Sequence, residues 1–345
     1  MTEINLDNSK LENINFSDVN DDCLYLSNKI INDSQFGAKL YKEFEAREAI
    51  LKNCHFEGLS LANAMLQKTF FDGCTFKNMK FIDCDFERSH FKNCMFENVA
   101  LNMVRFSRAS IIDGKWQEIE LDNCDLISVN MSKLNLENCR FNNCNFAQAK
   151  LMNSILLECS FSESKLNKTM FNHSKIESCH WRNAYLLQTN FMNTELKAAD
   201  FQAVAEMYQA SFIQSNLEEA NFQGIKAETL NFLKANLLKA NLAGLYAPTS
   251  QFAEANLTQS KLESANLQFS NFKDAVLTSA NCTKANLSYS NLVGANIDKT
   301  DFTRANLMTC DIHNAKGEPI YSNTNKEGLR QTNQQKLKAE NWSYV

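Results

Sequence analysis

The sequence is poor in the residues that usually make turns, with 2 Pro and 9 Gly among 345 residues. A fold with many tight turns would have to build them from other residue types. No apolar run approaches the roughly eighteen residues of a membrane-spanning helix, so no membrane span is expected. The first ten residues, MTEINLDNSK, lack the charged and apolar regions of a secretory signal. This predicts a cytoplasmic protein, or one exported by a route that uses no cleaved signal.

Sequence signatures of catalysis are also missing. The chain contains no GxGxxG, GxxxxGK, HExxH or GxSxG motif and no CxxC pair. Its five His residues are scattered, and carboxylates such as Asp83, Asp85 and Glu87 fit solvated corners better than an acid/base pair. We therefore predict no enzyme activity, no catalytic residue, no metal site and no cofactor.

A period of five dominates what is present. The stretch FDGCTFKNMKFIDCDFERSHFKNCMF at 71–96 has Phe at every fifth position. Large apolar residues keep this spacing from Leu51 to Phe201, and a usually smaller residue stands two positions before each. From Phe212 to Ile312 the pattern returns one residue out of phase. Helices place apolar residues three and four apart and strands two apart, so a sustained period of five indicates a stacked, solenoid-like fold.

These repeats resemble the pentapeptide-repeat family, whose motif is A(D/N)LXX with Leu or Phe at the centre. KANLLKANL at 234–242 matches that motif almost letter for letter, and an NCxF variant recurs in the first half, as in NCMF at 93–96. The resemblance covers about residues 51–315. It implies an all-β fold, a right-handed four-sided parallel β-helix with four pentapeptides per coil and about 13 coils. It implies little about function, because a shared scaffold does not fix a function.

Positions twenty apart should stack if each coil has four sides. The inward column Leu59, Met79, Val99 and Ile119 is large and apolar in four successive coils. Central positions shrink at Ala227 and Ala247, and the inward residues two positions earlier, Ile225 and Leu245, are larger. This compensation is expected when a narrow core must keep its volume.

Ten of the twelve cysteines fall on the inward small position, and Cys282 falls on a central one. We interpret them as small buried hydrophobic residues. Disulfides are not expected, because stacked Cβ atoms about 4.8 Å apart exceed the separation that a disulfide allows. Cys94→Ser is expected to destabilise, because the buried hydroxyl would lack an assured hydrogen-bond partner.

The departures from the period suggest five segments. Residues 1–50 are expected to form an acidic segment and cap, in which 37–51 has the apolar spacing of an amphipathic helix. Residues 51–201 and 212–315 are the two registers of the β-helix, and 202–211 form a bulge or short loop that shifts the register by one residue. Residues 316–345 form a C-terminal tail or cap with a helix-compatible stretch at about 326–340, near Trp342 and Tyr344.

The charge pattern bears on function. The formal net charge is −5, and outward columns alternate in sign, as in Glu57, Lys77 and Glu97. Alternation cancels the one-sign field that a DNA mimic or a nucleic-acid-binding protein needs, so no direct nucleic-acid binding is expected. The prediction is a non-enzymatic scaffold for protein–protein interaction. Two alternatives are a DNA mimic that protects or inhibits a type II topoisomerase, as the resemblance allows, and an effector or accessory of a bacterial secretion system.

Apolar residues at outward positions mark a candidate interaction patch. With four sides per coil they fall on two adjoining faces, where a protein partner or a second copy in a homodimer would bind. The members of this predicted patch are Ile112, Ile127, Met152, Met170, Tyr185, Leu187 and Met192.

Overall fold

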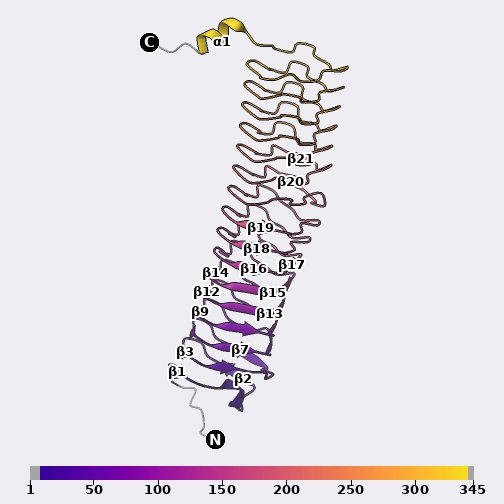
Figure 1. Ribbon diagram of the computed structural model, residues 1–345. Helices are drawn as coiled ribbons and strands as arrows, with labels where there is room; N and C mark the ends of the chain where they lie inside the picture. Colours follow the sequence, from indigo (N-terminus) through magenta and orange to yellow (C-terminus); the bar gives the residue numbers. More distant parts are fainter. Residues whose placement is uncertain (1–7, 341–345) are drawn as a thin grey trace, which may run out of the picture. The chain divides into compact units, whose positions relative to one another are not determined.

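The computed structural model describes residues 8–340. The chain forms two compact units, a first unit of Met1–Tyr185 and a second unit of Leu186–Val345. Within each unit the chain winds into coils that stack one on the next (Figure 1). Among the described residues, no helix combines the length and the apolar character that a membrane crossing requires.

Short parallel strands form the sheets of the first unit. One sheet has six strands in the order β1 (Lys10–Glu12), β3 (Ile30–Asn32), β6 (Ile50–Lys52), β9 (Phe70–Asp72), β12 (His90–Lys92) and β14 (Ser110–Ile112). A second sheet of eleven strands contains β4 (Gln35–Phe36), β7 (His55–Glu57), β8 (Ser60–Ala62), β10 (Thr75–Lys77), β11 (Lys80–Ile82), β13 (Met95–Asn102), β15 (Lys115–Asp122), β16 (Asn135–Glu137), β17 (Arg140–Asn142), β18 (Ile155–Leu157) and β19 (Lys175–Glu177). β2 (Cys23–Tyr25) pairs with β5 (Glu43–Glu45), and a 3-10 helix, η1, spans Phe16–Asp18.

Every strand pair in the first unit joins residues twenty apart. Phe76 of β10 lies beside Phe56 of β7 and Phe96 of β13, and Val99 lies beside Ile119. Parallel bridges at Glu45–Met65 and Ser110–Asn130 have the same offset on other sides of the coil. Twenty residues per coil in steps of five give four sides, so the predicted four-sided parallel β-helix is confirmed.

Large side chains fill the interior of the first unit. The Phe76 and Phe96 rings stack with centroids 4.4 Å apart, and Phe71 and Phe91 stack at 4.7 Å on another side. A void of only about 10 Å³ remains among the rings near Phe76. That volume is at the lower limit for a single water molecule, so side chains fill this part of the core.

The conformation of the turns explains how the chain forms so many of them with so few glycines. In nearly every pentapeptide the residue two after the central one has a positive φ, for example 55° at Asn153 and 59° at Arg108. Asn is frequent there because it tolerates the left-handed conformation better than most residues. The Asn of the A(D/N)LXX motif has another role, seen at Asn236: its Oδ1 accepts from the Leu238 backbone N–H at 3.3 Å, which closes the turn.

The same Asn side chains also link successive coils of the second unit. Asn236 Nδ2 donates to Asn216 Oδ1 at 3.0 Å, and Asn256 Nδ2 donates to Asn236 Oδ1 at 3.1 Å. A motif that is periodic in sequence therefore becomes a ladder of amide hydrogen bonds in space.

The expected amphipathic helix at 37–51 is wrong. That stretch contains β5 and the start of β6, and the coils already begin at β1. Phe44 and Ala46 are both buried, at 5% and 0% exposure. The large Phe44 occupies the inward position that is usually small, and the small Ala46 occupies the central position that is usually large. This exchange conceals the five-residue period and leaves a helix-like spacing of Leu40, Tyr41 and Phe44.

The second unit continues the same architecture, with β20 (Met207–Tyr208) paired to β21 (Ala227–Glu228) and parallel bridges elsewhere. The offset between coils is twenty-one residues from Asn190–Ser211 to Asp200–Asn221 and twenty from Ser211–Asn231 to Asn296–Lys316. Ile225, Ala227, Leu245 and Ala247 are all buried, as the proposed volume compensation requires.

The coils extend beyond the predicted limit at 315. The backbone of Asp311 forms a parallel β-bridge with that of Arg330, across a shortened last coil of nineteen residues. The Tyr321 ring stacks on the Phe302 ring with centroids 5.7 Å apart. A short helix, α1 (Gln334–Glu340), follows, so the C-terminal helix is confirmed. Trp342 and Tyr344 lie outside the described residues.

Candidate interaction surfaces

Each pentapeptide turns three side chains outward: the residue before the central one and the two after it. The strand sets the direction of the first two side chains, and the positive-φ turn sets the direction of the third. Since neighbouring coils pair residues about twenty apart, outward side chains form columns along the unit. Function therefore depends on which residues occupy these columns.

In the first unit, the structure places the five members of the predicted patch on two adjoining sides. Met170 and Tyr185 are exposed, each at 38%, while Ile112, Ile127 and Met152 are half-buried. Met170 extends a column through Asn130 and Lys150, and Tyr185 extends a column through Asn145 and Lys165.

Leu187 and Met192, the remaining members, belong to the second unit and are half-buried. The Met192 backbone N–H donates to Asn190 Oδ1 at 3.0 Å, the usual turn contact. Their side chains are therefore less available to a partner than those of Met170 and Tyr185.

Four lysines near the exposed patch residues were missed from the sequence. Lys133, Lys150, Lys165 and Lys168 are exposed, and none forms an ion pair with any residue in the described range. Backbone β-bridges between neighbouring coils place Lys150 beside Met170 and Lys165 beside Tyr185. The sequence contains this arrangement, because each of these two lysines stands twenty residues before its apolar neighbour and residues twenty apart are expected to stack.

Asp85, expected to be a solvated corner, is instead a buried ion-pair partner with 8% exposure. Arg105 Nη2 lies 2.9 Å from Asp85 Oδ2, Gln67 Nε2 also donates to Oδ2 at 2.9 Å, and the Glu87 backbone N–H donates to Oδ1 at 2.8 Å. Burial opposes ionisation of Asp85, but the hydrogen bonds from Glu87, Arg105 and Gln67 outweigh it and hold its pKa below the ordinary value. A carboxylate held ionised in this way is suited to structure and is a poor general acid.

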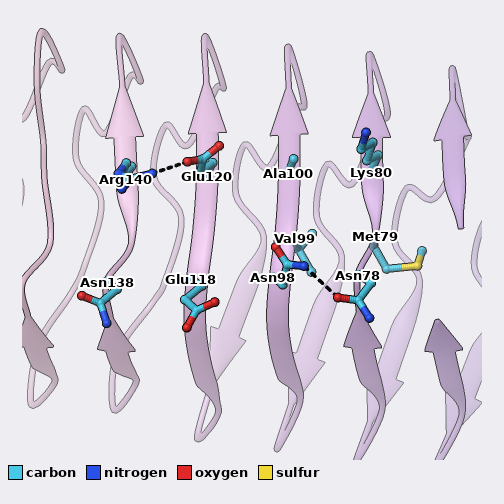
Figure 2. A pocket seen from close by; sticks show the side chains of 10 residues that line it. All are labelled: Asn78, Met79, Lys80, Asn98, Val99, Ala100, Glu118, Glu120, Asn138 and Arg140. Carbon is cyan, nitrogen blue, oxygen red and sulfur yellow. Dashed lines mark hydrogen bonds and ion pairs between the residues drawn. The ribbon is translucent and has the colours of Figure 1, made fainter. Parts of the chain in front are cut away.

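An open groove of about 710 Å³ follows one corner of the first unit (Figure 2). Figure 2 shows Asn78, Asn98, Glu118 and Asn138 in one row and Lys80, Ala100, Glu120 and Arg140 in the other. Asn98 Nδ2 donates to Asn78 Oδ1 at 2.7 Å, and Arg140 forms an ion pair with Glu120. Its two glutamates are balanced by Lys80 and Arg140, so the groove offers amide hydrogen bonds without a field of one sign.

Over four coils, within residues 246–309, one side of the second unit carries exposed aromatic rings and no charged residue. We call its outward residues the aromatic face: Tyr246, Pro248, Thr249, Asn266, Gln268, Phe269, Asn286, Ser288, Tyr289, Asn306, Met308 and Thr309. Phe269 and Tyr289 are 55% and 45% exposed, and their rings stack with centroids 4.9 Å apart. Both have a positive φ, near 60°, which bulky residues rarely adopt. Two aromatic residues twenty apart at the turn position are a sequence signal that was overlooked.

The cysteines behave as their positions predicted. Eleven of the twelve are buried, all twelve are free thiols, and Cys23 is half-buried. Burial raises the pKa of the Cys84 and Cys310 thiols to about 11. The described residues contain no group of three or more His, Cys, Asp or Glu side chains placed to hold a metal ion.

The buried thiols do have hydrogen-bond partners, contrary to the reasoning for Cys94→Ser. Cys94 Sγ donates to the carbonyls of Phe71 and Lys92 at 3.6 and 3.4 Å. The Ser154 hydroxyl uses the equivalent carbonyls of Met131 and Met152 at 3.3 and 3.2 Å. A serine therefore fits the inward position with its hydroxyl satisfied.

Three family models match parts of the chain. The model described as pentapeptide repeat region matches residues 134–205, and the model described as pentapeptide repeats (8 copies) matches 105–143, 250–281 and 275–314. The model described as SV2A/B/C luminal domain matches 5–101. No curated protein matches the sequence significantly.

Solved pentapeptide-repeat structures share local similarity with the chain. HetL from the cyanobacterium Nostoc sp. strain PCC 7120, involved in heterocyst differentiation regulation, is 18% identical, with 68% of this chain and 87% of HetL covered and a TM-score of 0.25. A trypsin-treated variant of QnrB1, a plasmid-mediated fluoroquinolone resistance protein, is 15% identical, with coverage of 74% and 99% and a TM-score of 0.24. With TM-scores this low, the fold assignment rests on the bridge ladders and the family models.

Proposed function

Because this chain belongs to the pentapeptide-repeat family, we propose that it is a non-enzymatic scaffold that binds a protein partner on the sides of its coils. The observation that carries the proposal is the exposure of Met170 and Tyr185, 38% each, on adjoining sides of the first unit. Met and aromatic residues are enriched in protein interfaces, where their large surfaces adapt to a partner.

The packing of the coils supports a scaffold. Ring stacks fill the interior of the first unit near Phe76, and the large groove of Figure 2 is open to solvent. Enzymes usually place their chemistry in enclosed pockets that exclude water. The surface offers columns of side chains for contact in place of such a pocket.

The surface charges favour a protein partner over DNA mimicry. Acids and bases in neighbouring coils pair with one another, as in Lys77–Glu97 and Arg105–Asp85. A mimic of nucleic acid needs an extended field of one sign, and alternating pairs cancel that field. Topoisomerase protection is accordingly not the function that we propose.

The proposal is tested by affinity capture from lysate of the source cells followed by mass spectrometry. The variant Met170→Ser with Tyr185→Ser removes the apolar contacts without adding charge. The matched control, Met95→Ser with Ile155→Ser, removes two apolar residues of similar exposure, 50% and 48%, from a different side of the first unit. We expect one captured protein to be lost with the first variant only. Equal capture by the parent and both variants contradicts the proposal.

Self-association through the aromatic face is a second candidate. This face carries no charged residue over four coils, so two copies can meet without like-charge repulsion. Sedimentation velocity over a range of concentrations tests this idea, because Phe269→Ser with Tyr289→Ser should abolish the dimer. A dimer that survives this change excludes the aromatic face.

A further inference from the structure

An unbalanced group of lysines lies where two sides of the first unit meet. We call Lys133, Lys150, Lys165 and Lys168, together with Met152, Met170 and Tyr185, the lysine edge. Its two main columns are held by the coil backbone: the Met170 N–H donates to the Ala149 carbonyl at 2.9 Å, and the Tyr185 N–H donates to the Ser164 carbonyl at 3.0 Å. Each exposed apolar residue therefore stands one strand, about 4.8 Å, from a lysine.

The lysine edge has no acidic residue of its own. On its two sides, the outward positions from Asn130 to Tyr185 contain no Asp or Glu. Glu163, at the turn two residues before Lys165, belongs to the adjoining side. In the coil below, the two sides carry Asp113 and Asp125, and the Asp125 carboxylate is already bonded by the Ser107 hydroxyl at 2.7 Å and the Ile127 N–H at 3.0 Å.

Elsewhere in the first unit several lysines pair with acids of a neighbouring coil. Lys68 pairs with Glu48 at 2.7 Å and Lys77 with Glu97 at 3.2 Å, each across one coil. The four lysines of the edge lack such partners throughout residues 8–340. Uncompensated like charges repel one another and create a local positive potential, which an anionic partner would relieve.

We propose that the lysine edge binds an acidic segment of a partner protein that also presents apolar side chains. This inference rests on the proposed scaffold function and specifies the chemistry of the partner. Carboxylates of the segment would pair with Lys150 and Lys165, while its apolar side chains cover Met170 and Tyr185. The combination matches the general plan of interfaces, in which apolar contacts give affinity and surrounding charges select the partner and speed association.

A long polyanion fits the edge less well than a short acidic segment. The chain as a whole has a formal net charge of −5, which repels an extended phosphate backbone beyond the edge. Lys is also a point charge, and the edge contains no Arg that could grip phosphates with two parallel hydrogen bonds.

Fluorescence anisotropy on the full chain tests the proposal. The probe is a labelled 15-residue peptide rich in Glu, with Leu at every fifth position, measured in 50 mM salt and again in 300 mM salt. The edge variant is Lys150→Glu with Lys165→Glu. The control variant, Lys80→Glu with Lys261→Glu, makes the same change in net charge at exposed lysines that form no ion pair in the described range. Circular dichroism confirms folding, and Lys150→Gln with Lys165→Gln serves as a milder second pair.

We expect the edge variant to bind the peptide at least about tenfold more weakly, the control to change binding less than about twofold, and the higher salt to weaken binding to the parent chain. Equal losses in edge and control variants, or no binding at 50 mM salt, overturn the proposal. Equally tight binding of a 15-nucleotide single-stranded DNA overturns it in favour of a nucleic acid.

The two proposals fail in different ways. If affinity capture is lost with Met170→Ser and Tyr185→Ser but is unchanged with Lys150→Glu and Lys165→Glu, the scaffold function stands and the acidic partner is wrong. If neither pair affects capture while the peptide still binds at the edge, the acidic-segment site stands and the captured partner binds elsewhere.

Discussion

Replacing Phe96 by Ala tests the stacked core most directly. Phe96 is 2% exposed, and its ring lies between Phe76, with centroids 4.4 Å apart, and Trp116, at 5.0 Å. These two neighbours are fixed by the pairing of β13 with β10 and β15, so the coils above and below cannot close over the space that the ring leaves. The substitution therefore creates a cavity instead of a local collapse.

The magnitude follows from the ring's environment. Removing a phenyl ring with roughly 100 Å² of buried apolar surface costs about 2.5 kcal/mol at 25 cal/mol per Å². Each lost ring contact adds about 0.5–1.5 kcal/mol. With two ring contacts the expected loss of unfolding free energy is about 3.5–5.5 kcal/mol, near the upper end of the usual range for a buried Phe→Ala change.

Urea unfolding followed by far-ultraviolet circular dichroism and by tryptophan fluorescence measures this loss. Met95→Ala is the matched control, because Met95 is the adjacent residue in β13 but is 50% exposed. It should change the free energy of unfolding by no more than about 0.5 kcal/mol. Equal effects of the two substitutions, or an unchanged midpoint for Phe96→Ala, would refute the assignment of inward and outward columns.

Three further predictions concern the thiols and the C-terminal helix. Cys94→Ser should change the free energy of unfolding by less than about 1.5 kcal/mol in urea titrations, because two carbonyls already accept from the side chain at this position; a loss above about 3 kcal/mol would show that the hydroxyl is not accommodated. Iodoacetamide labelling of the native chain, read by mass spectrometry, should modify Cys23 first, since the other eleven cysteines are buried; rapid labelling of Cys94 would contradict this burial. The hydrogen bond with His313 Nε2, 3.1 Å from Glu340 Oε2, lowers the pKa of Glu340, so this contact stabilises α1 above the ordinary pKa of 4.5 and is lost as pH falls through the lowered value. Hydrogen exchange of residues 334–340, corrected for intrinsic rates, should therefore speed up at acid pH in the parent and less in Glu340→Gln; identical pH profiles would refute the role of this contact.

The fold was largely predictable because one physical requirement recurs in every pentapeptide. A narrow four-sided core needs one large side chain per side, so a residue such as Phe76 is explained by its position in the period alone. The prediction failed where two core residues exchanged sizes. At Phe44 and Ala46 the total volume is kept but the period is hidden, and helical spacing then gave the wrong element.

The candidate sites were only partly predictable. Outward apolar residues such as Met170 and Tyr185 were found by position, and both are exposed. The lysines in the same columns as Met170 and Tyr185, and the Phe269–Tyr289 stack of the second unit, were not predicted, because single lysines and rings at outward positions are common on protein surfaces.

The sequence by itself determined the period, the inward columns and the four-sided coil, since each follows from local spacing and from the volume of a close-packed core. Only the tertiary structure decided which side chains lose their water. Asp85 and Arg105, Cys94 and the Phe71 carbonyl, and His313 and Glu340 are distant in sequence, and each pair meets only when coils or α1 pack together. Hydrogen bonds and ion pairs act over a few ångströms, so their partners depend on the rotamers and exact register of neighbouring coils, which a repeat pattern does not specify.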